Sequence, residues 1–157
     1  MTKTENKLPD FVALYERYQQ LKPGPKAELK RVANPDDLIE IPAFYRLLQG
    51  EHASPSMQRI IFCLPLITHI PDSDSLGQAL AKANINEKRL FMVIRSQEPN
   101  DLIQLRRLLK LASPTVDWLK MAKTLYYWNE LAKRQLLEDF FYYQTNAKTN
   151  AKTKATA

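Results

Sequence analysis

Signals for the start of a helix recur throughout this chain, and they constrain its fold more than any other feature of the sequence. Each signal combines a side chain that can accept a hydrogen bond from a free backbone N–H with a proline, an acid or a capping-box glutamine in the first turn. They stand at Asn34–Pro35, Ser54–Pro55, Ser75 with Gln78, Asn86–Glu87 and Ser113–Pro114. No run alternates with the period of a strand, and no Asn-Gly hairpin turn occurs. The pattern therefore predicts an all-α protein.

Apolar residues with helical spacing between these signals predict a compact bundle of about eight or nine helices. We expect helices near residues 10–21, 26–33, 42–49, 55–64, 75–84, 86–97, 100–112, 115–128 and 130–143. The last two could form one bent helix, since nothing near Trp128 forces a break. Pro65 is expected to end or kink the fourth helix. We expect a single helical domain over residues 10–143.

The last fourteen residues differ in composition from the rest of the chain. Residues 144–157 are polar and repetitive, hold three lysines and no acid, and lack apolar periodicity. Such a segment cannot bury enough apolar surface to offset the entropy of ordering. We therefore predict a disordered basic tail over residues 144–157.

Several kinds of site are excluded by residue counts and spacing. The three glycines, Gly24, Gly50 and Gly77, lie too far apart for a glycine-rich phosphate loop. Cys63 is the only cysteine, which excludes a disulfide framework and a cysteine zinc site. The adjacent carboxylates suit helix ends or exposed turns, so we find no arrangement for acid–base or two-metal chemistry. We expect a protein that is not an enzyme and needs no cofactor.

The chain also lacks the signals of export or membrane insertion. Its first ten residues contain no apolar segment of the kind found in a secretory signal. The longest mostly apolar run, Ile60 to Ile70, is too short to cross a bilayer. We expect a cytoplasmic protein without membrane contact.

Positive charge is concentrated in one part of the folded region. The formal net charge of the chain is +6, and residues 82–134 alone carry 11 basic and 5 acidic groups. Residues 10–81, in contrast, carry 7 basic and 9 acidic groups. This asymmetry predicts a polyanionic partner for the stretch 82–134.

Within that stretch, consecutive helices each show a basic face. In the helix after Asn100, leucines occupy one arc, while Arg106, Arg107 and Lys110 occupy another with no acid three or four residues away. The preceding helix carries Lys88, Arg89 and Arg95 on one side, and the following helix carries Lys123. Together they could form one surface that follows phosphates. The alternative is that each face is simply solvated, as lysine and arginine faces usually are.

Several sequence strings, taken in order, resemble a known family. They are LKRV from Leu29, IPAFYRLLQ from Ile41, QRIIFCL from Gln58, the run from Ser75 to Arg95, QLRRLLKLASPTVDW from Gln104 and QLLEDF from Gln135. Together they resemble the CasB family, the small subunit of Cascade, the type I-E CRISPR surveillance complex. The resemblance covers nearly all of residues 11–143.

The resemblance implies a non-catalytic subunit that works with the other Cascade subunits and with a second copy of itself. It implies contact with guide RNA, target DNA and the displaced strand without sequence specificity, which would stabilise the R-loop. Carried over by motif, the candidate nucleic-acid-binding residues are Lys30, Arg31, Arg59, Lys88, Arg89, Arg95, Arg106 and Arg107. The sequence departs from the family at Gln78, where an arginine is common.

A stand-alone helical DNA-binding regulator is the alternative function. Such a protein needs base-reading side chains near the N-terminal end of a recognition helix. The charges of the helix after Asn100 lie in its C-terminal half, which fits that function poorly.

Overall fold

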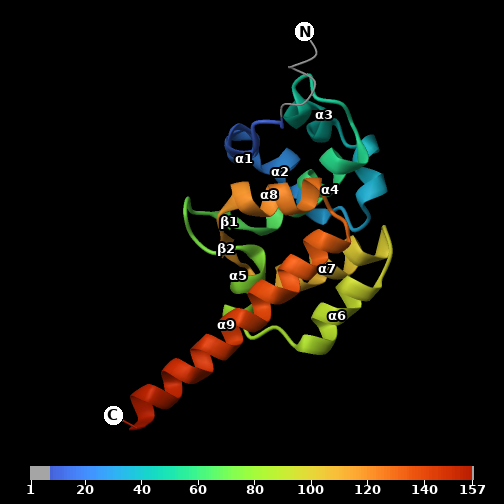
Figure 1. Cartoon of the computed structure of the whole chain (residues 1–157). Coiled ribbons are helices and arrows are strands. Elements are labelled where there is room, and N and C mark those ends of the chain that lie inside the picture. Colours follow the sequence, from blue (N-terminus) through green and yellow to red (C-terminus); the bar gives the residue numbers. More distant parts are fainter. Residues whose placement is uncertain (1–7, 157) are drawn as a thin grey trace.

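Helices form nearly all of the regular structure of this chain, which we describe from a computed structural model (Figure 1). The structure describes the backbone of residues 8–156 and the side chains of residues 8–146. In chain order the helices are α1 (Phe11–Gln20), α2 (Pro23–Arg31), the 3-10 helix η2 (Pro35–Glu40), α3 (Pro42–Leu48), α4 (Pro55–Cys63), the 3-10 turn η3 (Leu64–Leu66), α5 (Leu76–Lys82), α6 (Glu87–Arg95), α7 (Asn100–Ala112), α8 (Trp118–Tyr126) and α9 (Glu130–Thr156). The predicted all-α class is confirmed.

Four of the five predicted helix starts are confirmed by their caps. Asn34, Ser54 and Asn86 each accept a hydrogen bond from a backbone N–H in the first turn that follows. At α5, the Ser75 hydroxyl and the Gln78 side chain cap each other's backbone N–H groups in a complete capping box. The Asn34 signal begins the 3-10 helix η2, an element absent from the predicted helices. Pro65 also acts as expected, because α4 ends at Cys63.

The fifth predicted start, at Ser113–Pro114, is wrong. Ser113 has a φ of 44° and ends α7 in the left-handed conformation. The next helix, α8, begins at Trp118, where Asp117 accepts a hydrogen bond of 3.0 Å from the Leu119 N–H. Between these points, strand β2 (Thr115–Val116) pairs in parallel with strand β1 (Thr68–His69). The sequence did not predict this two-stranded sheet.

Helices α8 and α9 are separate, which decides between the two possibilities that the sequence left open. After α8 ends, the Asn129 side chain accepts a hydrogen bond of 2.9 Å from the Ala132 N–H and caps α9. Figure 1 shows α9 as a long helix whose C-terminal half projects away from the other helices. The backbone stays helical through residue 144, where the sequence predicts that a disordered tail begins, and α9 continues to Thr156.

Two contacts fix the N-terminal part of α9 against the other helices. Gly77 of α5 packs directly under α9, where an added Cβ atom would lie 2.5 Å from the Leu136 carbonyl oxygen. On α7, the buried Asp101 carboxylate accepts a hydrogen bond from the Trp128 indole at 2.8 Å and forms an ion pair with Lys133 at 3.0 Å. These contacts hold the start of α9 against both α5 and α7.

The core lies between the helices and contains large buried side chains from most of them, including Phe11, Phe44, Phe62, Trp118 and Phe140. Within the described residues, no helix has both the length and the apolar character needed to cross a membrane.

Candidate nucleic-acid interface

Three of the predicted cations meet where α2 and α7 come together. The Arg106 guanidinium donates a hydrogen bond of 3.1 Å from Nη2 to the Lys30 carbonyl oxygen. Lys30 and Lys110 line one pocket of about 330 Å³, together with residues of η3 and β1. We call Lys30, Arg106 and Lys110 the α2–α7 cluster.

The α2–α7 cluster carries positive charge that no acid balances. Among the side chains described, residues 8–146, none of its three members forms an ion pair. The Nε atom of Arg106 is buried and, within the same residues, has no hydrogen-bond partner. Three cations without a counter-charge suit an anion with several oxygen atoms, such as a phosphate.

Two further predicted residues lie next to this cluster in the sequence. Arg31 is the last residue of α2, and Arg107 follows Arg106 on α7; both side chains are exposed. Neither lines the pocket between Lys30 and Lys110. They add exposed positive charge to the two helices that carry the cluster, at the end of α2 and in the middle of α7.

The predicted cations of α6 form a second group. Lys88 and Arg95 border a groove of about 480 Å³ that Phe91 and Met92 also line. Arg89 is exposed on the same helix but does not line the groove. Helix α6 packs along α7, so the two basic helices are neighbours.

Arg59 has a structural position, which argues against the role predicted for it. Its side chain is only 11% exposed, and its guanidinium donates to the Leu125 and Tyr126 carbonyl oxygens at 2.7 and 2.8 Å. It also donates to Ser56 at 3.1 Å and pairs with Glu98 at 3.0 Å. With these bonds made, Arg59 holds the end of α8 against α4, and we leave it out of the interface.

Comparison with known proteins identifies the family. The family model described as CRISPR-associated protein Cse2 matches residues 25–143. The chain belongs to this family. The CasB resemblance drawn from the sequence strings is thereby confirmed.

Two relatives of this Cse2-family protein support the assignment at the level of sequence and structure. The CRISPR system Cascade subunit CasB of Escherichia coli (strain K12) is 42% identical over 147 residues, which covers 83% of this chain and 92% of the relative. A chain in the crystal structure of E. coli Cascade bound to a PAM-containing dsDNA target superposes with a TM-score of 0.84 at 42% identity, covering 89% of this chain and 99% of that chain.

A more distant relative shares the fold. The crystal structure of M. ruber CasB superposes on this Cse2-family chain with a TM-score of 0.65 at 17% identity. The match covers 92% of this chain and 98% of that chain. At this identity, the likeness shows that the helical arrangement is common to both proteins.

Lys123 lies apart from both basic groups. It is exposed on α8, and α8 packs mainly on α4 and α1. No hydrogen bond or shared pocket places Lys123 with the α2–α7 cluster or the α6 groove within the described residues. Its predicted role in binding nucleic acid stays a prediction.

Some basic residues of this family member form hydrogen bonds or ion pairs within the fold. No pattern in the sequence indicated these contacts. Arg17 donates from Nε and Nη2 to the Leu47 carbonyl oxygen at 3.2 and 2.8 Å. Arg17, Arg59 and Arg106 thus each bind a carbonyl oxygen in the last turn of another helix, α3, α8 and α2 respectively. Lys133 is held by Asp101. No local signal marks these residues, because their partners are distant in the sequence.

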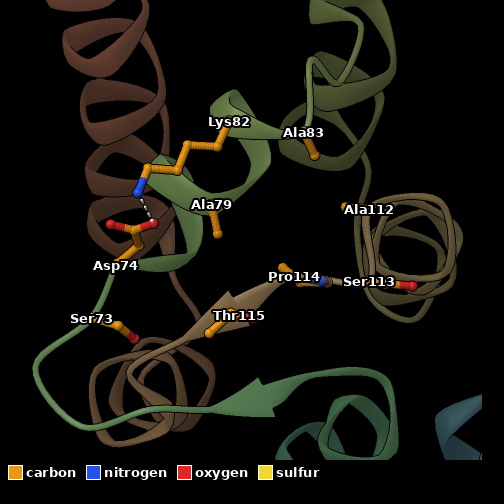
Figure 2. A pocket seen from close by; sticks show the side chains of 9 residues that line it. All are labelled: Ser73, Asp74, Ala79, Lys82, Ala83, Ala112, Ser113, Pro114 and Thr115. Atoms are coloured by element: carbon orange, nitrogen blue, oxygen red, sulfur yellow. Dashed lines mark ion pairs between the residues drawn. The ribbon is translucent and has the colours of Figure 1, made fainter.

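The hollow between α5 and the segment that joins α7 to β2 offers no free cation, although it has a volume of about 560 Å³ (Figure 2). Lys82, on its rim, is paired with Asp74 at 2.7 Å, as the dashed line in Figure 2 shows. The hydrogen bond to Asp74 is the main cause of the raised pKa of Lys82. This lysine is therefore already matched by an acid.

Cys63 is a free thiol buried in the core. Burial, and then the nearby Asp101 carboxylate, raise the pKa of the thiol from 9.0 to about 12. A thiol with this pKa is not a nucleophile at neutral pH. Among the described side chains, no group of three potential ligands could hold a metal ion.

Proposed function

We propose that this protein is a non-catalytic small subunit of a type I-E Cascade complex. In this role it joins the other Cascade subunits and a second copy of itself in the cytoplasm. It contacts guide RNA, target DNA and the displaced strand without sequence specificity, and thereby stabilises the R-loop. Family membership and the E. coli CasB relative support the assignment to Cascade. They also make a stand-alone DNA-binding regulator the weaker hypothesis.

The α2–α7 cluster is the observation that carries the nucleic-acid part of this proposal. Lys30, Arg106 and Lys110 come from two helices and present positive charge that no described acid balances. Lysine and arginine bind phosphates in this way without reading bases. The cluster therefore suits a strand backbone of any sequence.

Backbone contacts of this kind can decide whether an R-loop persists. Replacing a DNA duplex by an RNA–DNA hybrid is nearly balanced in free energy, so a small additional stabilisation shifts the equilibrium. Each phosphate neutralised adds roughly 0.7 to 0.9 units to the dependence of log affinity on log salt concentration. A few contacts to the opened strands disfavour re-annealing without any chemical step.

Dissociation of a relaxed duplex target from the assembled complex tests the proposal. We expect a complex without this subunit to bind guide RNA normally and to release the target several-fold faster. Replacing Lys30, Arg107 and Lys110 together by Glu should reproduce much of that increase while the subunit stays assembled. Arg106 is left unchanged because its bond to the Lys30 carbonyl links α7 to α2.

A matched variant separates the site from overall charge. Replacing Arg46, Lys120 and Arg134 by Glu makes the same change in net charge on α3, α8 and α9. This control should release the target at the wild-type rate. Equal rates with and without the subunit would reject strand holding, and equal effects of both triple variants would reject the α2–α7 cluster as the site.

A further inference from the structure

The groove along α6 combines cations with an exposed apolar surface. Its lining consists of Glu87, Lys88, Phe91, Met92, Arg95 and Ser96. We propose that this groove is a subsite for one nucleotide of a single-stranded nucleic acid, with the base stacked on the Arg95 guanidinium and a phosphate bound by Lys88. The inference rests on the proposed function and names the form of nucleic acid that this part of the protein accepts.

The stacking surface is built in layers. The Arg95 guanidinium carbon lies 5.0 Å from the centroid of the Phe91 ring, and Phe91 in turn contacts Phe141 of α9, with ring centroids 6.1 Å apart. Arg95 is exposed, so its guanidinium lies over the Phe91 ring and stays accessible to a ligand. Guanidinium planes and aromatic rings are the surfaces on which proteins stack unpaired bases.

The charge of the groove favours an anion. Lys88 and Arg95 are seven residues apart on the same face of α6, about 10 Å along the helix axis. Neither forms an ion pair among the side chains of residues 8–146. Glu87, in the first turn, is the one acid in the lining. A phosphate beside Lys88 therefore supplies the negative charge that no described ion pair gives to these two cations.

The apolar part of the groove distinguishes a single strand from a duplex. Met92 lies between the two cations in the sequence and is 50% exposed. In a duplex the base faces are stacked inside. The duplex therefore presents no open base face to the Met92 thioether or to the Arg95 guanidinium. An unpaired nucleotide offers a flat base and a phosphate within one residue. An acidic peptide offers the charge but no base-sized planar face.

Binding of three probes to the full chain tests this subsite. The probes are a short oligo-dT, an abasic strand of the same length and a short duplex, followed by fluorescence anisotropy. We expect the wild type to bind oligo-dT about five-fold or more tightly than the abasic strand, because stacking contributes roughly 1–3 kcal/mol per base. Arg95→Lys keeps the charge but removes the planar group, and should abolish that preference while leaving abasic and duplex affinities unchanged.

A matched exchange on the same helix controls for side effects. Arg89→Lys makes the same chemical change outside the groove and should keep the wild-type preference for oligo-dT. Met92→Ser should reduce the preference, which provides a second variant that leaves both cations in place.

The failures of the two proposals are distinguishable. A wild-type chain that binds none of the three probes would contradict the proposed function together with the subsite. Binding to all three probes with equal affinity, or an Arg95→Lys variant that keeps the preference for oligo-dT, would overturn the subsite alone.

Discussion

At the scale of single residues, the role of each basic side chain depends on whether protein groups are close enough to bind it. Lys30 and Lys110 stay exposed beside one pocket, whereas Arg59 is enclosed by carbonyl oxygens. The sequence placed all three among the candidate nucleic-acid-binding residues, Lys30 and Arg59 from family motifs and Lys110 from the basic face of its helix. Neither argument shows which partners a side chain meets far along the chain. The carbonyl partners of Arg59 lie 66 and 67 residues further along the chain. Such pairings depend on tertiary structure and leave no local trace.

Arg59→Lys should destabilise the fold. A lysine cannot reproduce the fork of bonds to Leu125, Tyr126, Ser56 and Glu98. Hydrogen bonds that involve a charged group contribute about 1.5–3 kcal/mol each, so we expect the free energy of unfolding to fall by about 2–3 kcal/mol. Urea unfolding measures this change, with Arg107→Lys as an exposed control. A variant as stable as the wild type would make Arg59 a candidate interface residue again.

At the scale of elements, the capped helices could be predicted because their signals are local. The capping box of Ser75 and Gln78 is complete within four residues, and α5 begins there. The pairing of β1 with β2 joins segments that are 47 residues apart and involves two residues on each side. That pairing has too short a pattern to stand out, and the Ser113–Pro114 signal nearby pointed to the wrong element.

The crossing of α5 and α9 depends on a glycine. At Gly77 an added Cβ atom would lie 2.5 Å from the Leu136 carbonyl oxygen and 2.7 Å from the Asp139 Cβ atom. Backbone cannot move aside cheaply, so Gly77→Ala should lower the free energy of unfolding by about 1–3 kcal/mol. Gly24→Ala, where no atom lies within 4 Å of the new Cβ, is the matched control and should be neutral or slightly stabilising. Thermal unfolding followed by circular dichroism measures both, and equal melting temperatures would contradict a tight crossing.

At the scale of the whole molecule, the fold and the basic character could be predicted, but their arrangement in space could not. The sequence placed most of the cations on exposed helix faces, and the structure divides them among the α2–α7 cluster, the α6 groove and Lys123 on α8, which lines neither pocket. The number of charges in each segment does not show which helices pack together. Helices α2 and α7 both pack against η3, and the bond from Arg106 to the Lys30 carbonyl joins them, which brings Lys30 to the α7 cations.

Removing residues 147–157 should affect the folded body little. The contacts described above that fix α9, including the crossing at Gly77 and the Asp101–Lys133 pair, all precede residue 147. We therefore expect the truncated chain to unfold at the same urea concentration as the full chain within experimental error. Binding to nucleic acid should weaken less than in the variant with Lys30, Arg107 and Lys110 replaced by Glu. Complete loss of binding on truncation would instead place the interface in the tail.

The bond between Arg106 and the Lys30 carbonyl also has a consequence for the entropy of binding. An arginine that is free in solution loses side-chain freedom when it binds a phosphate, and immobilising such a side chain costs about 0.5–1.5 kcal/mol. Arg106 is already anchored through Nη2, and its Nε atom is buried. Much of the ordering is therefore completed during folding, before a strand arrives. Calorimetry should show a smaller entropic penalty per contact for Arg106 than for the exposed Arg107.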